Sequence, residues 1–594
     1  MTQQKAADFL EPRLANLHPP EEISGIPAAV ERLQAALEKK EQIVLYGDYD
    51  VDGISSLALL CRVLRALGGR VDCFIPERAG EGYGLSMAGV ERCLKTFQPT
   101  LMVAVDCGTN SLKEAQLIRE RGADLIVVDH HELASTTNWG QATNLDKKTT
   151  LKSDTTIKQA VKICSLTPIL VNPQLADCHV APQSSLKQTI QSNCTTPEEP
   201  SHFVQSPLPL EGGSERLHYH YLCSVGLVFK LCHALLKTFP AQPLDLRNYL
   251  DLVALGTVAD IVPLIDENRI LVRHGLKQLA TSQWPGVQAL VRVSDIKPPY
   301  TSIDIGYRLG PRINAAGRLA SAEEALALLL TDDPLEAAAL AHGLDVRNCE
   351  RQEVERSVTL EAEVLAAAAF AITPRKSFVL GRPHWHPGVV GIVASRISKR
   401  WHRPTLIIGF DEEGRGKGSG RSIEGFSLVT ALEQCSHLLE AFGGHAMAAG
   451  VTLQELHLEK LQETFEKVAH ASLREEDLLP PLKIDAEVDL REINETWLTA
   501  QERLGPFGTA NPQPLYVARS VRPAKEPRVL KEKHLRLEFA SSRGGFLAAI
   551  FFNGAIDPLP EPPWDVAFTL ERNTYQGRTT VQMQVVALRK AIAS

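Results

Sequence analysis

The chain has 594 residues, of which 44% are hydrophobic and 23% are charged, and its formal net charge is −8. These values are typical of a globular protein, and the length predicts two to four domains with sizeable cores. The acidic balance excludes a generally basic nucleic-acid-coating protein, so any binding of nucleic acid must depend on local patches.

Targeting and membrane signals are absent from the sequence. No apolar run approaches the roughly 18–20 residues that cross a bilayer. The start, MTQQKAADFLEPR, lacks the basic and apolar stretches of a signal peptide. The eleven cysteines include no CxxC pair, which is typical of free thiols in a reducing compartment. We therefore expect a cytoplasmic protein that does not contact a membrane.

The first third of the chain alternates apolar runs with helical stretches, which predicts a parallel sheet covered by helices on both faces. The expected strands are Gln42–Gly47, Val71–Ile75, Leu101–Val105 and Leu125–Val128. The expected helices between them are Gly53–Leu67, Leu85–Phe97 and Ser111–Arg121.

Residues 134–216 interrupt this pattern with a stretch rich in Ser, Thr, Gln, Asn and Pro. We interpret most of it as a surface insertion, in which only Ser165–Asn172 resembles a strand. Helices are predicted to resume at Leu222–Thr238 and Leu246–Val258.

A second group of elements follows. Helices are expected at Ser321–Leu330 and Pro334–His342, and a longer one at Val346–Ala371 has no internal Gly or Pro and could bridge two domains. A second α/β unit is predicted from strand Phe378–Leu380, helix Val389–Trp401 and strand Thr405–Gly409. Beyond about residue 480, short alternating strands indicate a small β-barrel; they are Leu535–Phe539, Leu547–Phe552, Val566–Leu570 and Thr580–Val586.

Acidic residues and histidines follow three of the predicted strands. The first strand runs into Asp48, Asp50 and Asp52, the third into Asp106, and the fourth into Asp129-His130-His131. The carboxyl ends of parallel strands line one crevice, so these side chains should meet there. Asp260, at the end of a predicted helix, is a candidate fourth contribution.

Crowded carboxylates repel one another unless cations neutralise them. A mixture of carboxylate and imidazole ligands suits Mn²⁺ or Mg²⁺, and two such ions could clamp a phosphodiester for in-line attack. Taken singly, each motif could be only a turn or a helix cap. Their joint occurrence at one sheet edge favours a metal site.

The ordered motifs resemble those of the DHH phosphoesterases, and within them the RecJ-like exonucleases. The four DHH motifs correspond to DYDVDG (48–53), VDCG (105–108), DHH (129–131) and GTVAD (256–260). Segments similar to RecJ-like proteins are GPRINAAGR (310–318), WHPGVVGIVASR (385–396), GSGRS (418–422), GGH (443–445) with AAG (448–450), and GPFG (505–508). The resemblance covers nearly the whole chain except the insertion, which interrupts no motif.

This resemblance implies an N-terminal segment (1–40), a DHH catalytic domain (41–345), a connecting helix (346–372), a DHH-associated domain (373–475) and an OB-fold domain (476–594). It further implies a nuclease that digests single-stranded DNA from the 5′ end to 5′-mononucleotides. The setting would be recombination and repair, with a RecQ-type helicase and a single-strand-binding protein as partners.

The resemblance also implies roles for the acidic residues and histidines. Asp50 and Asp106 would hold one ion, with Asp48 nearby, and Asp106 would bridge to the second ion. Asp52, His130 and Asp260 would complete the second ion's ligands. His131 would contact the scissile phosphate, or alternatively orient a ligand.

Candidate DNA-binding residues are basic or lie near glycines. RecJ-like enzymes anchor the 5′ end in a pocket of the second α/β unit, which favours Ser419, Arg421 and His445 beside an expected glycine-rich loop at Gly414–Gly420. Arg312 and Arg318 are further candidates for backbone phosphates, and Arg396 belongs to a basic cluster that could equally be a solvated surface.

In the expected barrel, positive charge and aromatic side chains could bind a single strand. Strand alternation places at least one of Phe551 and Phe552 in the core. Two other functions remain open from the sequence. One is a DHH phosphodiesterase or pyrophosphatase acting on small substrates, which the barrel disfavours. The other is a non-enzymatic replication scaffold, which the complete ligand set disfavours.

Overall fold

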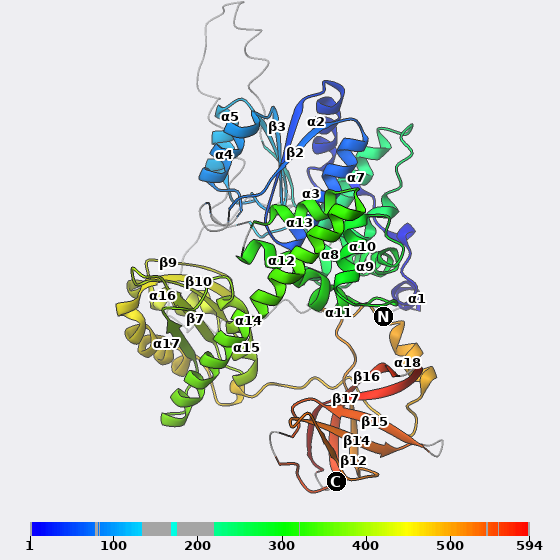
Figure 1. Ribbon diagram of the computed structural model, residues 1–594, viewed down its shortest axis with the longest axis vertical. Coiled ribbons are helices and arrows are strands. Elements are labelled where there is room, and N and C mark those ends of the chain that lie inside the picture. Colours follow the sequence, from blue (N-terminus) through cyan, green and yellow to red (C-terminus); the bar gives the residue numbers. More distant parts are fainter. Residues whose placement is uncertain are drawn as a thin grey trace, which may run out of the picture.

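The computed structural model describes residues 3–77, 81, 84–133, 168–174, 219–319, 321–541, 545–555, 558–575 and 577–591. These residues form three bodies (Figure 1): a large α/β body at the N-terminal end, a smaller α/β body, and a β body that carries the C-terminus. This is the fold class predicted from the sequence. The expected insertion at 134–216 lies outside the described residues except for 168–174.

The first sheet has five parallel strands in the order β2-β1-β3-β4-β5. Their bounds are β1 Gln42–Gly47, β2 Arg70–Phe74, β3 Leu101–Val105, β4 Asp124–Val128 and β5 Ile169–Val171. The four strands predicted first are confirmed to within one residue. The fifth is shorter than Ser165–Asn172, of which 165–167 lie outside the described residues.

Both faces of this sheet are buried, which explains why its strands are almost continuously apolar. Alternate residues of β1 enter different cores, Ile43 and Leu45 on one side and Val44 and Tyr46 on the other. On the Val44 face lie α4 (Met87–Phe97) and α5 (Leu112–Glu120). The other face is covered by a larger helical layer: α2 Ile26–Glu38, α3 Val51–Ala66, α7 Ser224–Lys237 and α8 Leu250–Ala259.

Further helices complete this body; they are α1 Gln3–Leu10, α9 Asp266–Leu279, α10 Pro285–Val293, α11 Ser302–Asp304, a π-helical turn η7 Ile305–Leu309, α12 Gly310–Leu319 and α13 Glu323–Leu330. One predicted helix, Leu246–Val258, is divided. Its first residues form a 3₁₀ turn, η6 (Leu246–Tyr249), and α8 then follows. The Asp245 carboxylate accepts a hydrogen bond from the Arg247 backbone N–H at this turn.

A single 39-residue helix, α14 (Pro334–Ile372), joins the two α/β bodies. The sequence predicted two helices here with a break near Gly343, and that prediction was wrong. An interior glycine costs a helix about 1 kcal/mol. Packing of α14 against α10, α12 and α13 offsets this cost. The C-terminal part of α14 packs on the second body, where Val358, Ala362 and Ala366 enter its core.

The second body contains a five-stranded mixed sheet in the order β6-β7-β8-β10-β9. Its strands are β6 Phe378–Arg382, β7 Thr405–Phe410, β8 Arg415–Arg421, β9 Ala441–Gly444 and β10 Ala448–Gln454. Its helices are α15 Val390–Trp401, α16 Leu428–Gln434 and α17 Leu458–Ser472. The predicted strand–helix–strand unit at its start is confirmed.

The expected glycine-rich loop at Gly414–Gly420 is instead the central strand β8. Its alternating glycines let neighbouring core side chains approach the backbone. A β-carbon added at Gly416 would lie 2.5 Å from the Phe410 ring, and one at Gly420 would lie 2.5 Å from Leu406. The glycines therefore serve packing within the sheet rather than loop flexibility.

The C-terminal body is a seven-stranded sheet in the order β11-β12-β16-β17-β15-β14-β13 around its own core. Its elements are β11 Ala486–Glu487, α18 Glu495–Glu502, β12 Tyr516–Val521, β13 Arg528–Leu530, β14 His534–Ala540, β15 Phe546–Phe551, β16 Trp564–Tyr575 and β17 Arg578–Lys590. Phe551 packs against the core and Phe552 is half exposed, as strand alternation predicted.

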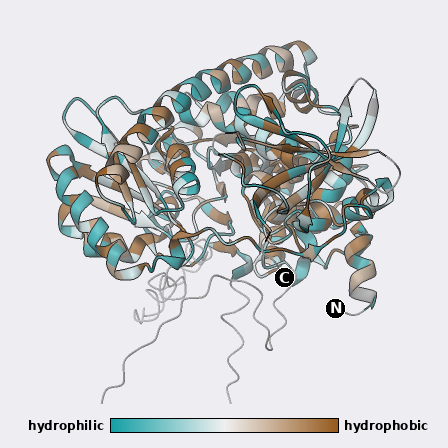
Figure 2. Cartoon of the chain, turned by 90° about the horizontal axis from the view of Figure 1, so that it is seen from below, coloured by the Kyte–Doolittle hydropathy of each residue, from teal (hydrophilic) through white to brown (hydrophobic). Residues whose placement is uncertain are grey.

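The loop between α18 and β12 of the C-terminal body is fixed to the first body by two arginines of α9. Arg269 donates hydrogen bonds to the Leu504 carbonyl (2.6 Å) and to the Arg503 carbonyl (3.1 Å). Arg273 reaches the Gly505 carbonyl at 3.1 Å. Figure 2 shows apolar segments concentrated within the bodies, and no helix in the described part of the chain is long and apolar enough to span a membrane.

The glycines of β8 provide a test of the packing argument. A β-carbon at Gly418 would lie 2.7 Å from both Ile408 and Val451, so Gly418→Ala should lower the free energy of unfolding by about 1–3 kcal/mol. In the matched control, Gly443→Ala on β9, the added β-carbon meets nothing within 4 Å. Urea denaturation should separate the two, and equal stabilities would contradict this account.

Candidate functional site

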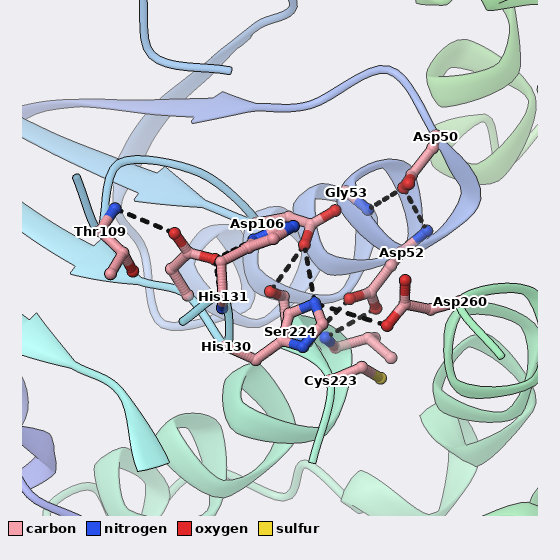
Figure 3. A network of polar contacts seen from close by, with 12 residues as sticks. Asp50, Asp52, Gly53, Asp106, Thr109, His130, His131, Cys223, Ser224 and Asp260 are labelled. Atoms are coloured by element: carbon pink, nitrogen blue, oxygen red, sulfur yellow. Dashed lines mark hydrogen bonds and ion pairs between the residues drawn. The ribbon is translucent and has the colours of Figure 1, made fainter. Parts of the chain in front are cut away.

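The acidic side chains predicted to meet do lie together at the carboxyl edge of the first sheet (Figure 3). Asp48 follows β1, and Asp106 follows β3 with a left-handed backbone (φ 62°) that aspartate tolerates. Asp48, Asp52 and Asp106 are buried. Three groups of candidate ligand atoms each lie within 4.8 Å of one another; they are Asp48/Asp50/Asp106, Asp106/His130/His131 and Asp52/Cys223/Asp260.

The DYDVDG segment turns sharply from β1 into α3. Asp50 is the N-cap of α3, and its carboxylate accepts hydrogen bonds from the backbone N–H groups of Asp52 (2.9 Å) and Gly53 (3.1 Å). A β-carbon at Gly53 would lie 2.5 Å from the Asp48 carbonyl oxygen, so only glycine allows this turn. The turn brings three aspartates of one short segment to the same edge.

The N-terminus of α7 holds two of these carboxylates. Asp52 accepts hydrogen bonds from the backbone N–H groups of Ser224 (2.7 Å) and Val225 (2.9 Å). The Ser224 hydroxyl donates to Asp106 at 2.9 Å. Sequence reasoning missed Ser224. Its position at the start of a predicted helix was the available signal, because helix N-termini favour negative charge.

The DHH segment consists of Asp129, which orients its neighbour, and two histidines that lie close to Asp106. His131 Nδ1 lies 2.7 Å from the Asp129 carboxylate, which also accepts a hydrogen bond from the Thr109 backbone N–H. Asn172, from the end of β5, donates to the His131 carbonyl. Burial favours a neutral His131, but its hydrogen bond and attraction to Asp129 raise the pKa of the ring to about 9. Asp129 therefore fixes the orientation of His131.

The electrostatics of the site favour an additional positive charge. Burial and then repulsion from neighbouring carboxylates raise the pKa of Asp52 to about 7 and of Asp260 to about 9, and raise the pKa of Asp106 well above its usual value. Burial, with repulsion from His131, lowers the pKa of His130 to about 4, which keeps that ring neutral as a metal ligand must be.

Unsatisfied polar atoms point to the same conclusion. His130 Nε2 and Asp260 Oδ2 are buried and lie 3.4 Å apart, yet neither atom has a hydrogen-bond partner among the described residues. Asp106 Oδ1 lies 3.5 Å from the same His130 nitrogen. Buried polar atoms without partners are costly, and a divalent cation would satisfy them. The residues present therefore fit a divalent-metal site.

The positions of the candidate ligand atoms can be compared with the two ligand sets expected from the sequence. Asp48, Asp50 and Asp106 form one group, and Asp106 also belongs to the group with His130 and His131, so it is placed to be shared. His130 lies between Asp106 and Asp260. Asp52 is grouped with Asp260 and with Cys223, which the sequence did not single out.

A cavity of about 1100 Å³ lies between the two α/β bodies. From the first body it is lined by Tyr49, which sits between Asp48 and Asp50, and by Arg318. From the second it is lined by His386, the start of α15, and residues of β8 that include Lys417, Ser419 and Arg421. One cavity thus adjoins the acidic segment on one side and a basic strand on the other.

Ser419 and Arg421 form a compact polar pair on β8. The Arg421 guanidinium donates to Ser419 Oγ at 3.0 Å, and burial lowers the pKa of Arg421. A β-carbon at Gly391 of α15 would lie 3.1 Å from Ser419 Oγ, so a glycine here leaves room beside the pair. The N-terminus of α15 therefore lies close to a half-buried cation, an arrangement that favours an anion.

The other candidate DNA-binding residues do not line this cavity. Arg312 pairs with Asp345 at 2.8 Å, and Arg396 pairs with the buried Glu355. His445 is exposed in the connection between β9 and β10. The cavity includes His386 of the WHPG segment, which the sequence did not select as a binding residue.

Family models match three parts of the chain. Residues 42–181 match the DHH family N-terminal domain, residues 369–471 the DHHA1 domain, and residues 484–587 the RecJ OB domain. The three matches fall on the three bodies of the fold.

Similar curated proteins are single-stranded-DNA-specific exonucleases named RecJ. The Salmonella typhimurium protein is 32% identical over 98% of this chain and 92% of its own length. The Bacillus subtilis protein is 34% identical over 86% of this chain but only 56% of its own length, so the chain spans about half of that relative.

Solved structures of RecJ from Thermus thermophilus are similar along the whole chain. The Mn²⁺ complex has a TM-score of 0.75 at 29% identity and covers 99% of this chain and 74% of its own. The Mg²⁺ complex has a TM-score of 0.70 at 28% identity, with coverages of 99% and 73%.

The repulsion within the site predicts an unusual response to Asp106→Asn. Asparagine can keep the left-handed backbone and accept the Ser224 hydrogen bond. The metal-free variant should be more stable than the wild type by roughly 1–3 kcal/mol, since one pKa unit of repulsion corresponds to about 1.4 kcal/mol. Its thermal stabilisation by added Mn²⁺ should be smaller.

Glu412→Gln, which removes an exposed acidic charge outside the site, is the matched control and should change neither quantity. Thermal melts with and without Mn²⁺ provide the measurement. An Asp106→Asn protein that is destabilised without metal and retains the full Mn²⁺ shift would contradict the assignment.

Proposed function

Because this chain belongs to the RecJ family of metal-dependent nucleases, we propose that it digests single-stranded DNA from the 5′ end to 5′-mononucleotides. One observation carries the proposal. The cavity between the α/β bodies is bounded by Tyr49, within the acidic segment, and by Ser419 and Arg421 on the facing strand. A 5′-phosphate held by that pair would place a nearby phosphodiester at the carboxylates.

The proposed ions are two Mn²⁺ or Mg²⁺, in keeping with the carboxylate and imidazole donors. Asp48, Asp50 and Asp106 would hold one of them. The ligands of the second would be Asp52, Asp106, His130 and Asp260. When bound, such ions activate water for attack on phosphorus and neutralise the charge that develops on the phosphate.

The protein's own residues would position the substrate and the ligands. Asp129 orients His131, whose raised pKa keeps it cationic and able to donate a hydrogen bond to the scissile phosphate. Ser224 and the N-terminus of α7 hold Asp106 and Asp52 in place. Ser419 and Arg421 would bind the 5′-phosphate, with Arg318 on the opposite wall.

We assign the tasks to the expected domains. Residues 41–345 would cut, residues 373–475 would hold the 5′ end across the cavity, and residues 476–594 would bind the strand that follows, with 346–372 as the connection. A cavity confined between two bodies joined by α14 would admit a single strand more readily than a duplex. The proposed setting is DNA recombination and repair, with a RecQ-type helicase supplying strands coated by single-strand-binding protein.

The polarity follows from this division and can be measured directly. With Mn²⁺ or Mg²⁺, wild type should release labelled mononucleotide first from 5′-labelled single-stranded DNA, and Asp106→Asn should be at least 100-fold slower, as losses of key electrostatic groups typically are. Release first from the 3′ end would reject the polarity. Cleavage of only very short oligonucleotides or pyrophosphate would favour a small-substrate enzyme, and absence of hydrolysis would favour a scaffold.

The 5′-phosphate pocket predicts a substrate preference. Arg421→Met should raise KM for 5′-phosphorylated DNA roughly 10- to 100-fold, because a hydrogen bond to a charged group contributes about 1.5–3 kcal/mol. The loss should be much smaller with a 5′-hydroxyl end. Arg400→Met, on an exposed part of α15 outside the cavity, is the matched control. A variant that still prefers the 5′-phosphate as strongly as wild type does would eliminate Arg421 as its ligand.

A further inference from the structure

An exposed aromatic and basic surface lies on the π-helical turn η7. Tyr307 is 76% exposed and Ile303, just before the turn, is 60% exposed. The adjacent Arg308 is exposed, and its guanidinium has no ion-pair or hydrogen-bond partner among the described residues. We call Ile303, Tyr307 and Arg308 the π-turn surface. An exposed aromatic side chain beside an unpaired cation is the combination that binds single-stranded nucleic acid, and π-turns often occur at functional sites.

The turn packs against α8, the helix that ends just before Asp260. A β-carbon at Gly310 would lie 3.5 Å from the Ala259 β-carbon and 3.9 Å from a methyl of Val51. Ala259 precedes Asp260, and Val51 stands between Asp50 and Asp52. The π-turn surface is therefore carried by an element that packs on α8, and the residue that follows it lies beside side chains of both acidic segments.

Residues beside the turn and beside Asp260 also contact the C-terminal body, at the loop between α18 and β12. The Ser302 hydroxyl donates a hydrogen bond to the Phe507 carbonyl. The Leu264 backbone N–H, four residues beyond Asp260, donates to the Thr509 carbonyl at 2.8 Å. Figure 1 places α11, which carries Ser302 and Ile303, at the edge of the first body that faces the β body. The π-turn surface therefore lies between the acidic site and the C-terminal body.

We propose that the π-turn surface binds single-stranded DNA on the 3′ side of the scissile phosphate, with Tyr307 stacked on a base and Arg308 paired with a backbone phosphate. This inference rests on the function proposed above. A strand that is cut at the carboxylates and bound by the C-terminal body must pass over the protein surface between these two sites. Every base offers a π-face, so a tyrosine binds without sequence preference, and the neighbouring cation matches the charge of the backbone.

The composition of the surface favours this occupant over a protein partner. Ile303 and Tyr307 stand four residues apart and so share one side of the helix. They form a narrow apolar strip suited to one stacked base rather than a broad protein interface, which typically buries about 800 Å² on each partner. Arg308 beside the strip supplies the charge that nucleic acid requires.

Base stacking can be measured without catalysis. Single-stranded DNA carrying 2-aminopurine at successive positions from a 5′-phosphate is bound to the full chain in EDTA, and its fluorescence is recorded. Wild type should quench the probe at one or two adjacent positions, because stacking on tyrosine quenches it. Tyr307→Phe should keep this quenching, Tyr307→Ala should lose it, and Leu456→Ala, which removes a 77% exposed side chain in the second body, should keep it.

A second measurement uses the active enzyme. Tyr307→Ala should raise KM roughly five- to a hundredfold for a 20-nucleotide substrate, the range expected for loss of one stacked base. It should leave KM for a trinucleotide and kcat for both nearly unchanged. Quenching that survives in Tyr307→Ala together with unchanged KM for long DNA would overturn the inference. So would loss of self-association in that variant with DNA binding intact, because the surface would then be a dimer contact.

Failure of the proposed function would look different. In that case the wild type itself would neither quench any probe nor degrade single-stranded DNA, whatever residue stands at position 307. If the wild type is active and Tyr307→Ala gives the same results in both measurements, only the assignment of the π-turn surface is wrong.

Discussion

Mutual repulsion among carboxylates buried at one sheet edge is the constraint on which the rest of this structure depends. Asp52, Asp106 and Asp260 have raised pKa values because burial and neighbouring negative charge both oppose their ionisation. The fold reduces this repulsion only in part, through backbone N–H groups at the starts of α3 and α7. The remaining negative charge, and the unsatisfied atoms of His130 and Asp260, are what a divalent cation would balance.

The elements around this cluster are arranged to hold it against that repulsion. The Asp50 carboxylate caps a helix, and the Asp52 carboxylate accepts hydrogen bonds from two backbone N–H groups. The Asp129 carboxylate interacts with His131 and with the Thr109 N–H. Backbone N–H groups thereby fix Asp50 and Asp52, whereas Asp129 is held by the Thr109 N–H and by the His131 ring. A site built in this way keeps its negative potential available for a metal and, through the metal, for a phosphate.

The arrangement of the bodies sets the distance between the carboxylate cluster and the strand that carries Ser419 and Arg421. Helix α14 is continuous and packs on both α/β bodies, so the facing walls of the cavity are linked by one rigid element. The arginines of α9 bind the loop between α18 and β12 of the C-terminal body to the first of these bodies. Hydrogen bonds thus hold the C-terminal body to the body that carries the acidic segment, which suits a strand that must be held at several points.

The sequence by itself determined that the sheet is parallel, which strands and helices follow one another along the chain, and that the aspartates and histidines meet, because parallel strands must deliver their carboxyl ends to one edge. Only the tertiary structure decided the rest. Ser224 reaches Asp106 from 118 positions away in the chain. Helix α14 continues through Gly343 because it packs on three other helices. Segment β8 is a strand because core side chains occupy the space beside its glycines. Arg312 and Arg396 were candidates for DNA binding from the sequence, but in the structure they form ion pairs with acidic residues. Such outcomes depend on which distant side chains come into contact, and local periodicity carries no information about that.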